Sequence, residues 1–262
     1  MCEIFCFNSD KPKEVNQCLE CFYNHSDEHP HGWGLANMQS GEFNIKKEPV
    51  KASCSKNLKN ILSNPVVGKN IFAHIRLATV GEIISPNCHP FIEADDNNRS
   101  WMLIHNGTIF DYPILDEYKD KGKGSTDSER ILLYIIDRVN EFEHNKGSIS
   151  TIKERFNLLA EIVADLSKNN KLNLMIYDGD LTYIHSNMKD SLYYLKNDEG
   201  FLIASTPLDG DENWKPVELN KLFGLIDGNI IFESEKHDNE FVFTDEYKNF
   251  LECKFADENH EN

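Results

Sequence analysis

The amino-acid sequence predicts an α+β fold with largely antiparallel sheets, and two features carry this prediction. The second half of the chain contains three pairs of short strand-like segments, and each pair is joined by a turn. Strands joined in this way pair antiparallel. Two helix-like segments, each with one apolar face, precede these hairpins. Helices packed on the outside of two sheets would bury the apolar faces of both kinds of element.

The expected hairpins join Leu172–Tyr177 to Leu181–His185, Leu192–Leu195 to Phe201–Ala204, and Leu222–Ile226 to Ile230–Phe232. Further strands are expected at Glu3–Phe7, Leu35–Met38, Glu42–Lys47, Asn70–Ala78 and Trp101–Ile104. A helix is expected over Pro12–Tyr23, and Lys51–Leu62 is expected to be a loop or a short helix.

The two main helices have recognisable starts. Thr126 and Glu129 have the spacing of a capping box, as do Thr151 and Glu154, which begin the helix Thr151–Leu166. Asp127 lies in the first turn of the earlier helix. A carboxylate there either complements the helix dipole or holds the ammonium group of a substrate.

Length and composition are consistent with one large core. The chain has 262 residues, of which 40% are hydrophobic. It contains no repeat and no linker rich in Pro, Gly or Ser. We therefore predict a single domain over residues 2–250, followed by an acidic tail at residues 251–262.

The charge balance disfavours two classes of partner. Lys and Arg number 27 and Asp and Glu number 44, which gives a formal net charge of −17. Nucleic acids and anionic membranes are bound mainly by basic surfaces, so we expect neither as a partner. There is no signal-like N-terminal pattern and no apolar run of about 20 residues. These features predict a cytoplasmic protein whose seven cysteines are free thiols.

Cys2 directly follows the initiator methionine. If Met1 is removed, one residue carries both a thiol and a free α-amine. Such an amine has a pKa of about 7.7–8.0, so it can act as a base near neutral pH. An N-terminal nucleophile activated by its own amine is one solution to catalysis by a thiol. The alternative is that Cys2 only begins a buried strand.

Two other segments have both a structural and a functional interpretation. Arg76 ends a predicted strand beside a glycine turn, where it can form a surface ion pair or present two donors to a carboxylate. Asn106-Gly107 is the commonest signal for a tight hairpin turn. An Asn amide beside a backbone N–H can instead stabilise an oxyanion.

A cluster of possible metal ligands raises a third alternative. Cys18 and Cys21 precede His25 and His29, but only three residues separate Cys21 from His25. A two-Cys, two-His zinc finger needs about a dozen residues at that point. The pattern therefore leaves a non-catalytic or zinc-binding module as an alternative, and buried thiols beside a polar loop as the simpler interpretation.

The candidate motifs form an ordered set. In chain order they are Cys2, His31-Gly32-Trp33-Gly34, Arg76-Leu77-Ala78-Thr79-Val80-Gly81, His89-Pro90-Phe91, Asn106-Gly107-Thr108-Ile109 and Ser125-Thr126-Asp127-Ser128-Glu129. With this set the chain resembles the class II glutamine amidotransferases, which are N-terminal-nucleophile (Ntn) hydrolases that begin with cysteine. It is most similar to the stand-alone members. The motifs cover residues 2–130, and the similarity extends to 204–208 and Trp214.

The resemblance implies a four-layer αββα sandwich, the Ntn-hydrolase fold, and a role for each matching residue. Cys2 would be the nucleophile and its α-amine the base. The other implied roles are binding of the glutamine α-carboxylate by Arg76, binding of its α-ammonium by Asp127, an oxyanion hole formed by the Asn106 side chain and the Gly107 N–H, and support of the pocket by Thr79 and His89.

Two departures from the family pattern stand out. The stand-alone relatives usually have an acidic residue before Gly-Trp-Gly, where this chain has His31. Members fused to a synthase carry Trp and His where this chain has Leu77 and Val80. The second difference fits a distinct branch, whereas the first concerns the details of the pocket.

The sequence therefore predicts an amidohydrolase that releases ammonia from glutamine through a γ-glutamyl thioester on Cys2. The ammonia acceptor is open, and it would be a small molecule or a separate protein. Hydrolysis of another γ-glutamyl amide is an alternative, because the same groups would hold it. No cofactor is expected, since the glycine-rich segment Lys121–Ser125 lacks the spacing of a phosphate-binding loop. No metal is expected either.

Overall fold

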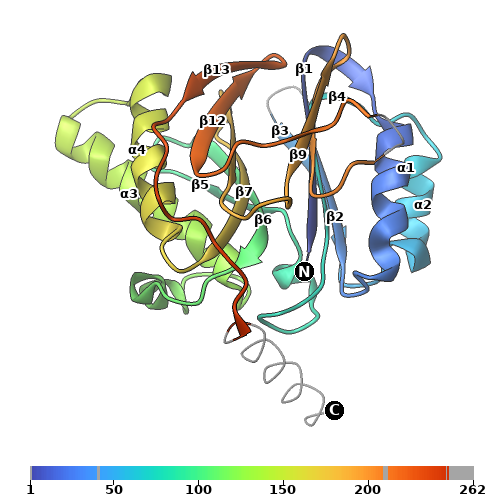
Figure 1. Ribbon diagram of the computed structural model, residues 1–262, viewed down its shortest axis with the longest axis horizontal. Coiled ribbons are helices and arrows are strands. Elements are labelled where there is room, and N and C mark those ends of the chain that lie inside the picture. The colour runs from blue at the N-terminus through green and yellow to red at the C-terminus, as the bar shows by residue number, and fades with distance from the viewer. Residues whose placement is uncertain (1, 40–41, 209–211, 246, 248–262) are drawn as a thin grey trace.

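The computed structural model describes residues 2–39, 42–208, 212–245 and 247. Two antiparallel sheets pack face to face, and helices cover both outer faces (Figure 1). The α+β class and the four-layer αββα arrangement predicted for this chain are thus confirmed.

The first sheet has the strand order β11-β9-β10-β1-β4-β2-β3. Its strands are β1 (Glu3–Glu14), β2 (Trp33–Gln39), β3 (Glu42–Glu48), β4 (Val67–Ile75), β9 (Tyr193–Asn197), β10 (Gly200–Ala204) and β11 (Lys215–Pro216). The N-terminal strand β1 lies inside this sheet, between β10 and β4. The first residues of the chain are therefore fixed by neighbours on both sides.

The second sheet has the strand order β13-β12-β8-β7-β6-β5. Its strands are β5 (Phe91–Ala94), β6 (Ser100–Thr108), β7 (Lys171–Tyr177), β8 (Thr182–Ser186), β12 (Lys221–Ile226) and β13 (Asn229–Glu233). The three hairpins predicted in the second half of the chain are present as β7–β8, β9–β10 and β12–β13.

The helices divide between the two outer faces (Figure 1). They are α1 (Asn16–Asn24), α2 (Lys56–Leu62), α3 (Asp127–Lys146) and α4 (Ile152–Leu166). Short 3₁₀ helices span His25–Asp27, Ala52–Cys54, Ser85–Asn87 and Pro113–Tyr118. Helices α1 and α2 cover the first sheet, and α3 and α4 cover the second. None of the helices in the described part of the chain is long and apolar enough to cross a membrane.

The alternation of side chains along β1 shows how the layers form. Phe5 and Phe7 pack toward α1, whereas Ile4 and Cys6 pack in the layer between the two sheets. A strand sends successive side chains to opposite faces, so an apolar strand buried on both faces serves two cores at once. Cys2 has the same parity as Ile4 and Cys6, which directs its side chain to the layer between the sheets.

The predicted helix Pro12–Tyr23 begins too early. Strand β1 runs to Glu14 because Lys13 and Glu14 pair with Gly68 and Val67 of β4. Helix α1 begins only at Asn16. The pairing partners lie some 50 residues away in the sequence, so local helix signals could not reveal them.

One structural alternative and one prediction do not hold. Asn106-Gly107 is not a tight turn, because β6 continues through both residues and pairs them with Asn173 and Leu172 of β7. Glu129 does not complete a capping box with Thr126, although the Thr126 hydroxyl accepts from the Glu129 N–H. The Glu129 carboxylate accepts instead from the backbone N–H groups of Lys123 and Gly124. The predicted box at Thr151 and Glu154 is present. The predicted tail at 251–262 lies outside the described residues.

Candidate active site

A small cavity lies where β1 begins, β4 and β6 end, and α3 starts. It is lined by Cys2, Arg76, Leu77, Ala78, Thr79, Val80, His89, His105, Gly107, Thr126, Asp127 and Ser128. Six of the seven predicted site residues are in this set, and the seventh, Asn106, precedes Gly107 on β6. The interior is about 20 Å³, room for about one water, so a larger molecule can enter only if the walls separate.

Cys2 directly precedes β1 and lies toward the inner face of the first sheet. Its side chain is partly buried, and its Sγ lies 3.4 Å from the carbonyl oxygen of Leu77. Burial raises the pKa of this thiol, while the bond to Leu77 and the charges of Arg76 and Lys171 act in the opposite direction. Because burial dominates, the thiol needs a base before it can react as a nucleophile at neutral pH.

Arg76 follows β4 directly and is buried, with 2% of its surface exposed. Its guanidinium donates to the carbonyl oxygens of Val80, Gly81 and Glu82 at 2.9–3.0 Å. Gly81 has φ +79, a conformation that favours glycine, which allows the loop to curl back onto Arg76. A guanidinium has five N–H groups. Those not used by the loop remain for a carboxylate in the cavity.

His31 occupies the position before Gly32-Trp33-Gly34, where the family pattern usually has an acidic residue. Its ring Nδ1 accepts from the backbone N–H of Ala78 at 2.9 Å, and the backbone N–H of His31 donates to the Arg76 carbonyl oxygen. Burial and the charge of Arg76 lower the pKa of His31, which favours the neutral ring that this bond requires. The neutral imidazole thus provides a hydrogen-bond acceptor that holds the segment after Arg76. A carboxylate could also act as an acceptor.

Asp127 is the first residue of α3 and joins this helix to the end of β6. One carboxylate oxygen accepts from the N–H of Ile109 at 2.9 Å, and the other accepts from the N–H of Ser128 at 2.9 Å. Each carboxylate oxygen can accept more than one bond. Asp127 can therefore be held in place by the backbone and still accept from an ammonium group in the cavity.

Asn106 and Gly107 lie side by side on β6, but they face different surroundings. The Asn106 side chain is buried, donates from Nδ2 to Ser205 Oγ at 3.1 Å, and accepts from Lys171 Nζ at 3.1 Å. Gly107 lines the cavity. A Cβ at Gly107 would lie 2.0 Å from the Lys171 carbonyl oxygen, so only glycine fits this close approach of β6 and β7.

His89 and Thr79 complete the predicted set. His89 stacks on His74 with ring centroids 4.0 Å apart, and neither ring nitrogen of these two buried side chains has a partner within the described residues. Burial lowers the pKa of both rings well below the usual range, so both are neutral near pH 7. Thr79 lies in the loop that Arg76 holds and is half-buried.

Sequence reasoning missed several polar residues around the cavity. Lys171 and Ser205 hold the Asn106 amide, and His105 lies within 3.0 Å of the Ser128 hydroxyl through Nδ1. Ser205 belongs to a segment noted only for its resemblance to the family. Lys171 carried one signal that could have been used, since it is a lysine at the start of a strand that is otherwise buried on both faces.

The possible zinc ligands do not gather. His25 pairs with Glu3 at 2.8 Å, and His29 Nδ1 contacts the His25 carbonyl oxygen at 2.9 Å. Cys18 and Cys21 pack against the core between α1 and the first sheet. Among the described residues, no group of three or more His, Cys, Asp or Glu side chains is arranged to hold a metal ion.

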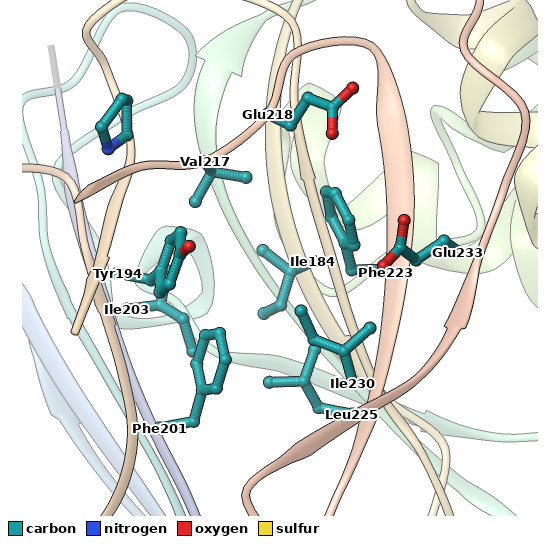
Figure 2. Close-up of a pocket in the computed structure, with 11 residues that line it drawn as sticks. Ile184, Tyr194, Phe201, Ile203, Val217, Glu218, Phe223, Leu225, Ile230 and Glu233 are labelled. Carbon is teal, nitrogen blue, oxygen red and sulfur yellow. The ribbon is translucent and has the colours of Figure 1, made fainter. Parts of the chain in front are cut away.

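A larger cavity lies elsewhere between the two sheets, toward the edge strands (Figure 2). Its volume is about 200 Å³. Figure 2 shows Tyr194, Phe201 and Ile203 on one side, opposite Phe223 and Leu225. Two carboxylates, Glu218 and Glu233, lie at its rim and both pair with Lys221. Its lining contains no thiol and no oxyanion donor pair, so we place the chemistry at the smaller cavity.

Comparisons with known proteins identify the family and the fold. Residues 1–201 match the family model described as glutamine amidotransferases class-II. An uncharacterised protein of Methanocaldococcus jannaschii is 28% identical over 266 residues, which cover 90% of this chain and 72% of that protein.

Two solved structures share the fold. A predicted glutamine amidotransferase from Pseudomonas aeruginosa superposes with a TM-score of 0.64 at 18% identity, covering 88% of this chain and 99% of that one. Glutamine phosphoribosylpyrophosphate amidotransferase from B. subtilis gives a TM-score of 0.64 at 17% identity, covering 92% of this chain and 50% of that one. The chain therefore has the Ntn-hydrolase fold, is an enzyme of the amidohydrolase type, and belongs to the class II glutamine amidotransferases.

Proposed function

We propose that this enzyme hydrolyses the side-chain amide of glutamine through a γ-glutamyl thioester on Cys2. One observation carries the proposal. In a chain of this family, a single small cavity gathers the thiol of Cys2, the guanidinium of Arg76, the carboxylate of Asp127 and the backbone of Gly107.

The charges of these groups suit glutamine. Its α-carboxylate and α-ammonium need one cation and one anion, and its neutral amide needs a nucleophile with oxyanion donors. Arg76 supplies the planar cation, with N–H groups that the loop 80–82 does not use. Asp127 supplies the anion, already oriented by two backbone N–H groups. Cys2, Asn106 and Gly107 then correspond to the reacting end.

The proposed reaction begins with proton transfer from the Cys2 thiol to the α-amine of the same residue. The thiolate attacks the amide carbon, and the new oxyanion is stabilised by the Asn106 side chain and the Gly107 N–H. The C–N bond breaks as the ammonium form of the amine returns its proton to the leaving nitrogen, and ammonia departs. Water then attacks the thioester, and glutamate and the thiol are released. Removing one such oxyanion donor costs about 3–4 kcal/mol.

The raised pKa of Cys2 fits this sequence of steps, because a thiol that starts protonated needs a base. The α-amine of Cys2 exists only after Met1 has been removed. Before removal the same nitrogen belongs to an amide, which cannot accept the proton. We therefore expect the unprocessed chain to be inactive.

A second candidate is hydrolysis of another γ-glutamyl amide. A relative from Mycolicibacterium smegmatis, 25% identical over 161 residues that cover 62% of each chain, is named gamma-glutamyl-hercynylcysteine sulfoxide hydrolase. Arg76 and Asp127 would hold the γ-glutamyl group of such a substrate in the same way. The two candidates differ in the leaving group, and only glutamine would supply ammonia to an acceptor, whether a small molecule or a separate protein.

The test is intact-mass analysis of the purified protein before and after treatment with a diazo-ketone analogue of glutamine. We expect a chain without Met1 that gains one adduct, located at Cys2 by peptide mapping. A processed chain that gains no adduct, and that releases no ammonia from glutamine, contradicts glutamine as the substrate. Turnover of a γ-glutamyl amide by that same protein then identifies the second candidate.

A further inference from the structure

A buried lysine beside the candidate site has no role in the chemistry described above. Lys171 begins β7 and has 1% of its surface exposed. Its Nζ donates to Asn106 Oδ1 at 3.1 Å. An ammonium group removed from water loses much of its hydration free energy. A lysine in such a place therefore needs groups that offset this loss, and the neighbouring amide is one of them.

The contacts of Asn106 define the orientation of its amide. A lysine ammonium can only donate, so the atom it meets must be the amide oxygen rather than the nitrogen. Nδ2 donates one hydrogen to Ser205 Oγ at 3.1 Å. Ser205 Oγ also accepts from the Ile4 N–H at 3.0 Å, and Ile4 lies two residues after Cys2. Nδ2 carries two hydrogens, so one remains for an oxyanion.

We propose that Lys171 is a positioning residue: it holds the Asn106 amide with one N–H directed to the reacting carbonyl, and the charge of its ammonium group acts on Cys2. This inference rests on the proposed function, since an oxyanion forms only if an amide is attacked. Lys171 acts on Cys2 through charge and on the oxyanion through Asn106. Ser205 holds the same amide from its other end.

The charges around Lys171 support this role. Its charge lowers the pKa of the Cys2 thiol, in opposition to burial. Burial lowers the pKa of Lys171 itself to about 8, while the charge of Cys2 acts in the opposite direction. The other charged or titratable groups nearby are Arg76, which also acts on Cys2, and His105, whose ring nitrogens contact the Ser128 hydroxyl at 3.0 Å and the Lys171 carbonyl oxygen at 3.3 Å. The positive charge is therefore present at neutral pH.

Two substitutions separate the hydrogen bond from the charge. Lys171→Met removes both, and Lys171→Gln keeps a neutral N–H donor on a side chain that is one atom shorter. We expect Lys171→Met to lower kcat for glutamine at least about tenfold, with KM changed by less than about threefold, because the loss is confined to the transition state. Lys171→Gln should recover part of kcat.

A second readout does not require turnover. The rate of alkylation of Cys2 by iodoacetamide, followed by mass spectrometry of its peptide, reports the fraction of thiolate at each pH. Both Lys171 variants should shift the midpoint of this profile to higher pH, since both lack the charge. Lys47→Met is the matched control. Lys47 is another lysine, partly buried, that donates hydrogen bonds to the carbonyl oxygens of Cys88 and Pro90, and its loss should leave the Cys2 profile unchanged.

Ser205→Ala tests the positioning alone and is a small change. We expect lower kcat, unchanged KM and an unchanged alkylation profile. An unaltered Cys2 profile in both Lys171 variants, together with kcat within twofold of the wild type, would overturn the inference while leaving the proposed function intact. A wild-type protein that hydrolyses no amide overturns the proposed function, and the alkylation profile then still decides whether Lys171 acts on Cys2.

Discussion

Two regions of the layer between the sheets differ in both polarity and space. The region at the start of β1 is polar and small, with an interior of about 20 Å³. Its polar groups include Cys2, Arg76, Asn106, Asp127 and Lys171. The region toward the edge strands is apolar, with a cavity of about 200 Å³ lined largely by aromatic and aliphatic side chains (Figure 2).

The difference between the two regions shows that the larger space need not coincide with the site we propose. Apolar side chains leave gaps when the shapes of two sheets do not match, and such gaps need no function. Buried polar groups are different, because burial costs free energy unless hydrogen bonds offset the loss of water. A partly buried thiol and a buried guanidinium, amide and ammonium, each with specific hydrogen bonds, are therefore a better guide to a candidate site than volume is.

The largest effect should separate two cysteines on the same face of β1. We expect Cys2→Ala to lower glutamine hydrolysis at least about 1,000-fold with little change in stability. Cys6→Ala should retain activity but lose about 1–2 kcal/mol of unfolding free energy, because Cys6 is fully buried between the sheets. Ammonia release and urea unfolding measure the two outcomes. Full activity in Cys2→Ala would remove the proposed mechanism.

The next effect concerns binding at the polar region. Arg76→Lys should raise KM for glutamine about 10–100-fold, because a lysine cannot hold the loop 80–82 and grip a carboxylate with two donors. Arg99→Lys is the control. Arg99 pairs with Asp95 and Glu143 at the β5–β6 hairpin, away from the cavity. Steady-state kinetics of both variants check this, and equal KM values would exclude Arg76 from substrate binding.

Acid should weaken the polar region, because the buried His74 stacks on His89, which lines its cavity. The folded-state pKa of His74 lies well below its ordinary value of 6.5 because the ring is buried, so below pH 6.5 the unfolded chain binds more protons. The contribution of the neutral His74 ring to the free energy of unfolding is therefore fully present above about pH 6.5, and it decreases as the pH falls below that value. The loss of unfolding free energy expected from His74 alone is about 2 kcal/mol at pH 5, where carboxylates still titrate little.

The matching variant is His74→Phe, which keeps a flat ring without a titrating group. Urea unfolding at pH 7.5 and pH 5.0 should show a loss of stability about 2 kcal/mol smaller than in the wild type. Tyr194→Phe, in the apolar region, should show the wild-type loss. A His74→Phe protein with the wild-type pH dependence would mean that His74 is not the source of acid sensitivity.

The smallest effect should come from the apolar cavity. Val217→Ile adds one methylene to its wall, where Val217 is 7% exposed. Filling part of a cavity should raise the unfolding free energy by about 0.5–1 kcal/mol and leave kcat unchanged. Thermal unfolding and ammonia release check both parts. A fall in kcat at unchanged stability would show that this cavity communicates with the site.

Much of the architecture, and most residues of the candidate site, could be predicted from the amino-acid sequence. Alternating apolar residues and turn signals predicted the hairpins β7–β8, β9–β10 and β12–β13, because these patterns act over a few neighbouring residues. The ordered motifs singled out six residues that the structure places around one cavity. Their roles remain predictions, but their proximity could be anticipated from residues spread over the first half of the chain.

The neighbours of the candidate site residues could be seen only in the tertiary structure. Asn106-Gly107 became strand rather than turn because β7, more than 60 residues later, pairs with both. Lys171 and Ser205 reach Asn106 from 65 and 99 residues away, and the lowered pKa values of His74 and His89 arise from burial between two sheets. Hydrogen bonds and desolvation depend on neighbours in space, and a linear pattern does not specify which distant segments become neighbours.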